Sequence, residues 1–220
     1  PQYLSRVQQP IGEPLASDFP TTFVPRRKRC PRGSRERRER RPVTEQKMAA
    51  ANIHIHEGDL PASVSFGASV AVDSETLGLK PHRDRLCVVQ LSAGDGSAHL
   101  VQLSQTGYDA PNLKALMADP GVLKIFHYAR FDVAVIKHYL GVDTQPIYCT
   151  KIASKLSRTY TDRHGLKDIT SELLGIELSK QQQSSDWAAA RLSQQQQAYA
   201  ASDVLHLHKL KDRLDAMLER

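Results

Sequence analysis

Acidic side chains stand at three places in the sequence where they could bind divalent metal ions. Asp73 and Glu75 close an apolar, β-branched run, and the period of two along a strand puts both carboxylates on one face. Two such carboxylates repel each other unless a cation lies between them. Asp132 enters an expected helix, and Asp203 follows Tyr199 by four residues, so phenol and carboxylate share a helix face.

Each of these features also has an ordinary structural explanation. A D-x-E pair occurs often on solvated strand ends, and Asp132 could simply stabilise the N-terminus of a helix. Tyr199 and Asp203 could form a plain tyrosine–acid hydrogen bond. The three features together are more informative, because three matches in the right order arise by chance much less often than one.

In their order, the three acidic motifs resemble those of the DEDD superfamily of 3′→5′ exonucleases, in its tyrosine-bearing subgroup. The histidine-bearing subgroup has a histidine five residues before the last acid, where this chain has Ala198, which leaves Tyr199 as the candidate. A resemblance to ribonuclease D extends from Met48 to Arg220 and includes residues 126–132 and 183–187. Since no helicase-and-ribonuclease-D domain follows, the compact bacterial group that includes nano-RNase C is the most similar.

The resemblance implies an enzyme, a metal-dependent 3′→5′ exoribonuclease that cleaves short RNA oligonucleotides down to dinucleotides, with DNA as an alternative substrate. Asp73, Glu75 and Asp203 would hold one of two divalent ions, Mg²⁺ or Mn²⁺, and Asp73 with the substrate phosphate the other. Asp132 would act largely through ordered water. Tyr199 would orient the attacking water, because a phenol with a pKa of about 10 positions water better than it deprotonates it.

Two other functions remain open. A proofreading DNA exonuclease would use the same residues, but no polymerase module or partner motif is recognisable. A catalytically inactive nucleic-acid-binding or scaffold protein could keep the fold without the chemistry, although all four acids and Tyr199 are present.

The resemblance also implies substrate contacts, each with a structural alternative. Leu79 could wedge between the terminal bases or lie in the core, and Trp187 could stack on a base or pack internally. His127 could contact the substrate or be a packed histidine. Arg130 and Lys180 could contact phosphate or be plain exposed charges. Tyr128 stands where the family often has asparagine. The implied substrate-binding residues are Thr76, Leu79, His127, Arg130, Lys180 and Trp187.

The elements that must position these residues form an α/β pattern. Strands are expected over 68–73, 86–91, 98–103, 122–126 and 147–149, helices over 112–118 and 131–140, and only helices after 150. The first three strands follow one another closely and predict an antiparallel meander, and the last helix is expected to run unbroken from Tyr199 to Leu218. We predict a mixed five-stranded sheet flanked by helices, the ribonuclease H-like (DnaQ-like) fold.

Positive charge is concentrated at the start of the chain. Residues 1–47 hold 12 Lys and Arg against 5 Asp and Glu, whereas residues 48–220 hold 18 against 19. Because the first segment is rich in proline and has no sustained hydrophobic period, we expect a disordered basic tail that is dispensable or non-native, with Met48 as the natural start. A phosphate-binding arm is the alternative. Residues 48–220 would form a single exonuclease domain.

The remaining composition bears on location and assembly. No apolar run approaches the roughly 20 residues that span a bilayer, and no signal peptide opens the chain, so we expect a cytoplasmic protein without a membrane partner. The 3 cysteines lie far apart and match no zinc-ligand spacing. Members of the compact group assemble into rings, so the resemblance implies a homo-oligomer.

Overall fold

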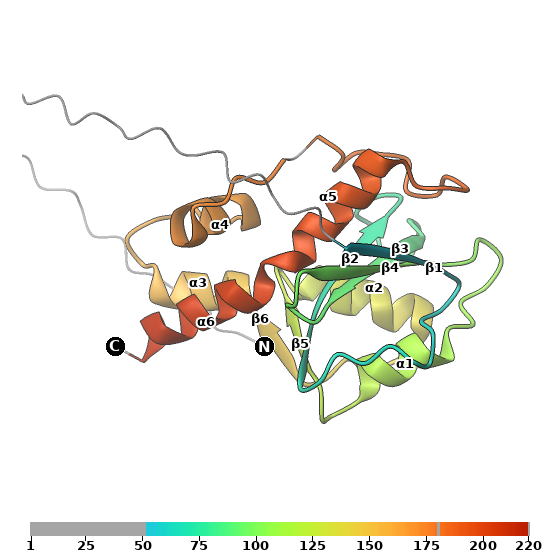
Figure 1. Ribbon diagram of the computed structural model, residues 1–220, viewed down its shortest axis with the longest axis horizontal. Coiled ribbons are helices and arrows are strands. Elements are labelled where there is room, and N and C mark those ends of the chain that lie inside the picture. The colour runs from blue at the N-terminus through green and yellow to red at the C-terminus, as the bar shows by residue number, and fades with distance from the viewer. Residues whose placement is uncertain (1–51, 180, 220) are drawn as a thin grey trace, which may run out of the picture. The chain divides into compact units, whose positions relative to one another are not determined.

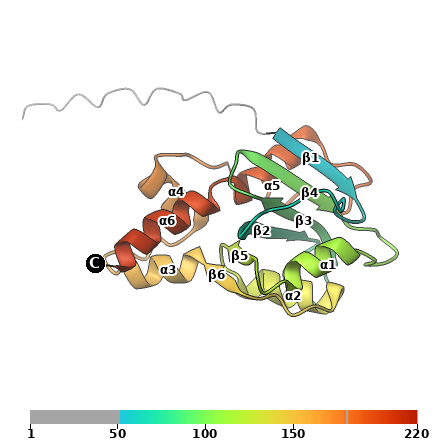
Figure 2. The ribbon, with the colours of Figure 1, turned by 60° about the horizontal axis from the view of Figure 1, so that its bottom comes forward.

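The structure is a computed structural model that describes residues 52–179 and 181–219. Within them, one mixed sheet carries helices on both faces (Figures 1 and 2). The expectations for the basic tail and for Lys180 fall on residues outside the described ones. Among the described residues, no helix is both long and apolar enough to cross a membrane.

The sheet has the strand order β1-β4-β3-β2-β5-β6. Its strands are β1 (Asn52–Glu57), β2 (Ser69–Thr76), β3 (Leu86–Ser92), β4 (Ser97–Gln102), β5 (Leu123–Phe126) and β6 (Ile147–Cys149). β2, β3 and β4 pair antiparallel in sequence, which confirms the predicted meander. β5 and β6 continue the sheet beyond β2 in parallel, which confirms its mixed character.

The predicted number of five strands was wrong, because β1 adds a sixth. It pairs in parallel with β4 along the edge of the sheet, from Asn52 opposite Ser97 to Glu57 opposite Gln102. Four of its six residues are asparagine, histidine or glutamate, and these alternate with the two isoleucines for most of its length, so it has no apolar run like those of the central strands. A solvated edge strand of this composition is difficult to recognise before its partner is known.

The helices are α1 (Pro111–Ala118), α2 (Arg130–Leu140), α3 (Thr150–Ser157), α4 (Leu166–Leu174), α5 (Gln194–Leu205) and α6 (Leu207–Leu218). α2 ends at Leu140, as predicted, and Gly141 follows it in the left-handed conformation. Two expectations were wrong: residues 181–193 form no helix, and the last helix is divided at His206. Because the helix is divided, α5 covers the sheet and α6 packs against α3. The spacing of the leucines continues across His206, so the sequence gives no sign of the division.

The two faces of the sheet bury different cores. Val70 and Val72 of β2 pack with α1 and α2, whereas Ala71 packs with Val204 of α5 on the opposite face. Because side chains alternate along a strand, Asp73 points to the same face as Ala71. The alternation of β2 therefore directs its acids toward α5.

Candidate active site

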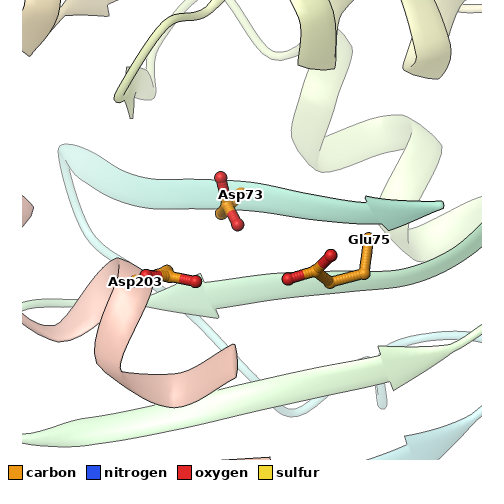
Figure 3. Close-up of side chains that lie close together, drawn as sticks. All are labelled: Asp73, Glu75 and Asp203. Atoms are coloured by element: carbon orange, nitrogen blue, oxygen red, sulfur yellow. The ribbon is translucent and has the colours of Figure 1, made fainter. Parts of the chain in front are cut away.

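Three carboxylates from two elements converge at the end of β2. Asp73 and Glu75 lie two residues apart on this strand, and Asp203 lies in the third turn of α5, which crosses the same face. One oxygen from each of the three lies within 4.8 Å of the others (Figure 3). Carboxylate oxygens at this spacing are the ligand set that a hard divalent cation prefers, so the site fits Mg²⁺ or Mn²⁺.

The fourth predicted acid joins this group from α2. Asp132 is only 3% exposed, and its carboxylate accepts a 2.6 Å hydrogen bond from Ser74 Oγ. It is not one of the three residues whose oxygens converge. Ser74 was missed at first, because a serine between two acids carries no signal of its own.

Burial and mutual repulsion dominate the electrostatics of the site. Burial is the main cause that raises the pKa of Asp73 to about 7 and that of Glu75 to about 10, and the neighbouring acids add to the latter. Burial and the nearby Asp73 also raise the pKa of Asp132 and of Asp203 well above the usual range. The four carboxyl groups thus resist ionising together unless a cation offsets their repulsion.

Tyr199 lies one helical turn before Asp203 and lines the same cavity. Burial raises the pKa of its phenol far above the ordinary value, and the negative charges of Asp203, Glu75 and Asp73 raise it further. The phenol therefore stays protonated near neutral pH. Its hydroxyl can orient a water molecule by hydrogen bonding but cannot remove a proton from it.

A cavity of about 600 Å³ opens in front of the acids. Three predicted substrate contacts line it: Thr76, Leu79 and His127. The Leu79 side chain is 83% exposed, which rules out a core position. His127 shares a 2.9 Å hydrogen bond with Thr150 Oγ1, and burial, assisted by Lys151, lowers its pKa to about 4, so it is neutral.

Two other predicted contacts lie elsewhere. Trp187 is 1% exposed and packs with Val88, Leu100 and Ala200, so the structure places it in the core, where no base can stack on it. Arg130 is exposed at the start of α2 and is not part of the cavity wall.

The cavity wall also contains a residue that had not been assigned a role. Tyr128 has a φ of 72°, which is rare for a residue with a Cβ, and its side chain is 46% exposed. Lys151 Nζ lies 4.0 Å from the centroid of its ring. The departure from asparagine at this position was the only signal in the sequence.

Comparison with known proteins relates this site to a family. A family model described as 3′→5′ exonuclease matches residues 46–219. Ribonuclease D of Acidiphilium cryptum is 35% identical over 151 residues, which are 69% of this chain and 38% of that protein. The chain thus spans well under half the length of this curated relative.

Solved structures share both sequence and fold with the chain. NrnC of Brucella melitensis bound to pGG is 57% identical with a TM-score of 0.75, over 78% of this chain and 83% of that one. The same protein with bound Mg²⁺ is 56% identical with a TM-score of 0.73, over 77% and 83%. The similarity therefore covers more than three quarters of this chain.

Proposed function

Since this chain belongs to the ribonuclease D-like 3′→5′ exonucleases, we propose that it hydrolyses phosphodiester bonds at the 3′ ends of short RNA oligonucleotides. Its membership rests on the family match over residues 46–219 and on the similarity to NrnC, and it confirms the family predicted from the motifs. The observation that carries the proposed chemistry is the convergence of Asp73, Glu75 and Asp203 at the cavity.

The proposed cofactors are two divalent cations, Mg²⁺ or Mn²⁺. When bound, they supply a nucleophilic water near neutral pH and neutralise charge on the phosphate and the leaving oxygen. Asp73, Glu75 and Asp203 would hold one ion, and Asp73 with the substrate phosphate the other. Asp132, fixed by Ser74, would hold an ordered water. NrnC of Brucella melitensis, to which the chain is similar, binds Mg²⁺, which supports the choice of cation.

Three side chains of the cavity would position the substrate and the water. The protonated phenol of Tyr199 orients the attacking water toward the phosphorus atom. Leu79, which is exposed at the cavity, would wedge between the last two bases. Because Thr150 Oγ1 donates to Phe126 O, it accepts from His127 Nδ1–H, so the neutral His127 keeps Nε2 as an acceptor for a substrate hydroxyl and does not attract phosphate by charge.

Short substrates fit this site better than long ones. A cavity of about 600 Å³ lies within the range of small-ligand pockets, roughly 300–1,000 Å³. Residues 48–220 hold 18 Lys and Arg against 19 Asp and Glu, whereas tight binding along a long RNA depends on many basic contacts. NrnC bound to pGG supports a substrate as short as a dinucleotide. DNA is the alternative substrate, and a direct comparison of cleavage of RNA and of DNA decides between them.

The test is digestion of 5′-labelled RNAs of two to about twenty nucleotides, with a DNA of matched sequence, in Mg²⁺, in Mn²⁺ and in EDTA. Asp73→Asn should abolish cleavage with the fold intact, because loss of one ligand charge weakens the cation site. Asp109→Asn, an exposed acid outside the cavity wall, is the matched control and should cleave normally. If Asp73→Asn cleaves RNA at the wild-type rate, the proposed function is wrong.

An inactive wild-type protein that still binds RNA would instead support the nucleic-acid-binding alternative. The convergence of the acids does not favour that alternative, since a pure binding protein would have no use for four carboxylates that repel phosphate.

We also propose that the protein is a homo-oligomer. Ile152 and Leu156 on α3 are 59% and 66% exposed, and Tyr160, four residues further on, is 67% exposed. Ile152 and Leu156 lie one turn apart on α3 and so form one exposed apolar strip, which is typical of a protein–protein contact, whereas Tyr160 lies beyond the end of the helix at Ser157. Leu156→Glu should lower the mass measured by light scattering, while Lys155→Glu on the neighbouring face should not.

We propose the following organisation of the whole chain. Residues 48–220 would be one exonuclease domain, residues 1–47 would be dispensable for activity, and the protein would work in the cytoplasm.

A further inference from the structure

Gln90 is a buried polar residue that the proposed mechanism does not yet use. It lies on β3, inside the sheet, and its side chain is fully buried. Within the described part of the chain, neither the nitrogen nor the oxygen of its amide has a hydrogen-bond partner. Because buried amides in proteins are nearly always paired, this one calls for an explanation.

The register of the sheet places Gln90 beside the acidic site. It is the antiparallel partner of Asp73, and Val88, two residues earlier, is the partner of Glu75. Directly opposed residues of an antiparallel pair have their Cβ atoms about 4.5–5.5 Å apart and point to the same face. Val88 packs with Ala200 of α5, so Gln90 also lies on the α5 side of the sheet.

We propose that Gln90 is a positioning residue for the metal-binding site: its amide N–H, unpaired in this structure, donates a hydrogen bond to the carboxylate of Asp73 when that carboxylate binds a cation. This proposal rests on the proposed function. A carboxylate that binds a cation through one lone pair can accept hydrogen bonds on its others, and such a bond fixes its orientation. An uncharged donor does this without cancelling the negative charge that attracts the cation, as lysine or arginine at this position would.

The proposal separates metal affinity from other properties of the protein. Gln90→Met keeps the length of the side chain and removes the donor, so affinity for Mn²⁺ or Mg²⁺ should fall about 10- to 100-fold, as is usual for residues that orient metal ligands. At saturating metal, KM for a dinucleotide should be unchanged and kcat largely restored. The metal-free variant should be at least as stable as wild type, because an unpaired buried amide has been removed.

The experiment is calorimetric titration of Mn²⁺ into the full chain, comparing wild type, Gln90→Met, Thr170→Val and Asp73→Asn. Thr170 also has a buried hydroxyl without a hydrogen-bond partner, but it lies on α4 outside the cavity wall, so its variant is the matched control and should bind normally. If Gln90→Met binds Mn²⁺ more weakly than wild type and Thr170→Val does not, the proposal is supported. Wild-type affinity in Gln90→Met overturns it, even if stability changes.

The Asp73→Asn variant in this comparison tests the proposed function separately. If Asp73→Asn binds Mn²⁺ as tightly as wild type, the acids are not the metal site, and the Gln90 proposal falls with the proposed function. If binding depends on Asp73 but not on Gln90, only the Gln90 proposal fails. Should Gln90→Met not fold, a crystal structure of the wild type with Mg²⁺ decides: Nε2 at roughly 2.7–3.2 Å from an Asp73 oxygen supports the bond, and a separation beyond about 3.5 Å overturns it.

Discussion

Among the individual residues, burial acts on the acids and on Tyr199 in the same direction but with opposite consequences. It raises the pKa of each carboxyl group, so Asp73 and Glu75 must release protons before they can bind a cation. It raises the pKa of Tyr199 as well, which keeps the phenol neutral and able to donate. The same low-polarity surroundings therefore make the acids dependent on metal and make the tyrosine a stable hydrogen-bonding group.

Replacing Tyr199 by Phe tests whether the phenol takes part in catalysis. The change removes one hydroxyl and leaves the ring, so the free energy of unfolding should change by about 1 kcal/mol or less. If the hydroxyl orients the attacking water, kcat should fall about 100-fold or more, while substrate and metal affinities persist. Single-turnover kinetics on a dinucleotide measure this, and an unchanged rate of the chemical step would remove Tyr199 from the mechanism.

Among the elements, α5 matters most because it carries both Tyr199 and Asp203. Its N-terminus is closed by a capping box: Gln196 N–H donates to Ser193 Oγ, and Ser193 N–H donates to Gln196 Oε1. Its middle packs on β2, β3 and β4. The helix is thus held at its start by hydrogen bonds and along its length by the sheet, which fixes the two side chains over the cavity.

Ser193→Ala should destabilise the protein by about 1 kcal/mol, because the first turn of α5 loses its side-chain acceptor. Ser193→Asp keeps an acceptor at the same position and should retain most of the stability. Urea unfolding of the two variants, monitored by circular dichroism, provides the comparison. Equal stabilities of Ala and Asp at this position would mean that the capping box contributes little to the hold on α5.

In the whole molecule, the acidic site should make stability depend on pH and on metal. The folded pKa of Glu75, about 10, and of Asp73, about 7, lie above their unfolded values of 4.5 and 3.8. This contribution to stability is therefore complete below the unfolded pKa and is lost as pH rises through the folded pKa. In EDTA, the free energy of unfolding should fall between pH 7 and 8.5 by about 1.4 kcal/mol per pH unit for each proton retained by the folded state.

Mg²⁺ should reduce or reverse this fall, because it binds the ionised acids of the folded state. The measurement is urea unfolding at several pH values in that range, with EDTA and with Mg²⁺. Glu75→Gln mimics the protonated group permanently and serves as the control, since it should flatten the slope in EDTA. A wild-type slope that is flat in EDTA would show that the acids ionise freely without metal.

Removal of residues 1–47 tests the organisation of the chain. The sheet, both cores and the wall of the cavity lie within the described residues, so a chain starting at Met48 should keep its melting temperature and its rate on a dinucleotide. A phosphate-binding arm would produce a different result: its deletion would raise KM more for long RNA than for short RNA and flatten the dependence of binding on salt.

Local periodicity was enough to predict much of this protein from its sequence. The alternation of a strand placed Asp73 and Glu75 on one face, and the turn of a helix placed Tyr199 beside Asp203. These relations depend only on backbone geometry over a few residues. The order of the motifs then indicated the family, and with it the fold.

Only the tertiary structure decided which distant residues meet. The edge position of β1, the division of the last helix at His206 and the burial of Trp187 all depend on packing partners far away in the chain. The bond from Ser74 to Asp132 and the position of Gln90 opposite Asp73 depend on the register between strands and on how α2 meets the sheet. No local period encodes these contacts, because the free energy that selects them comes from burying surfaces that are separated in sequence.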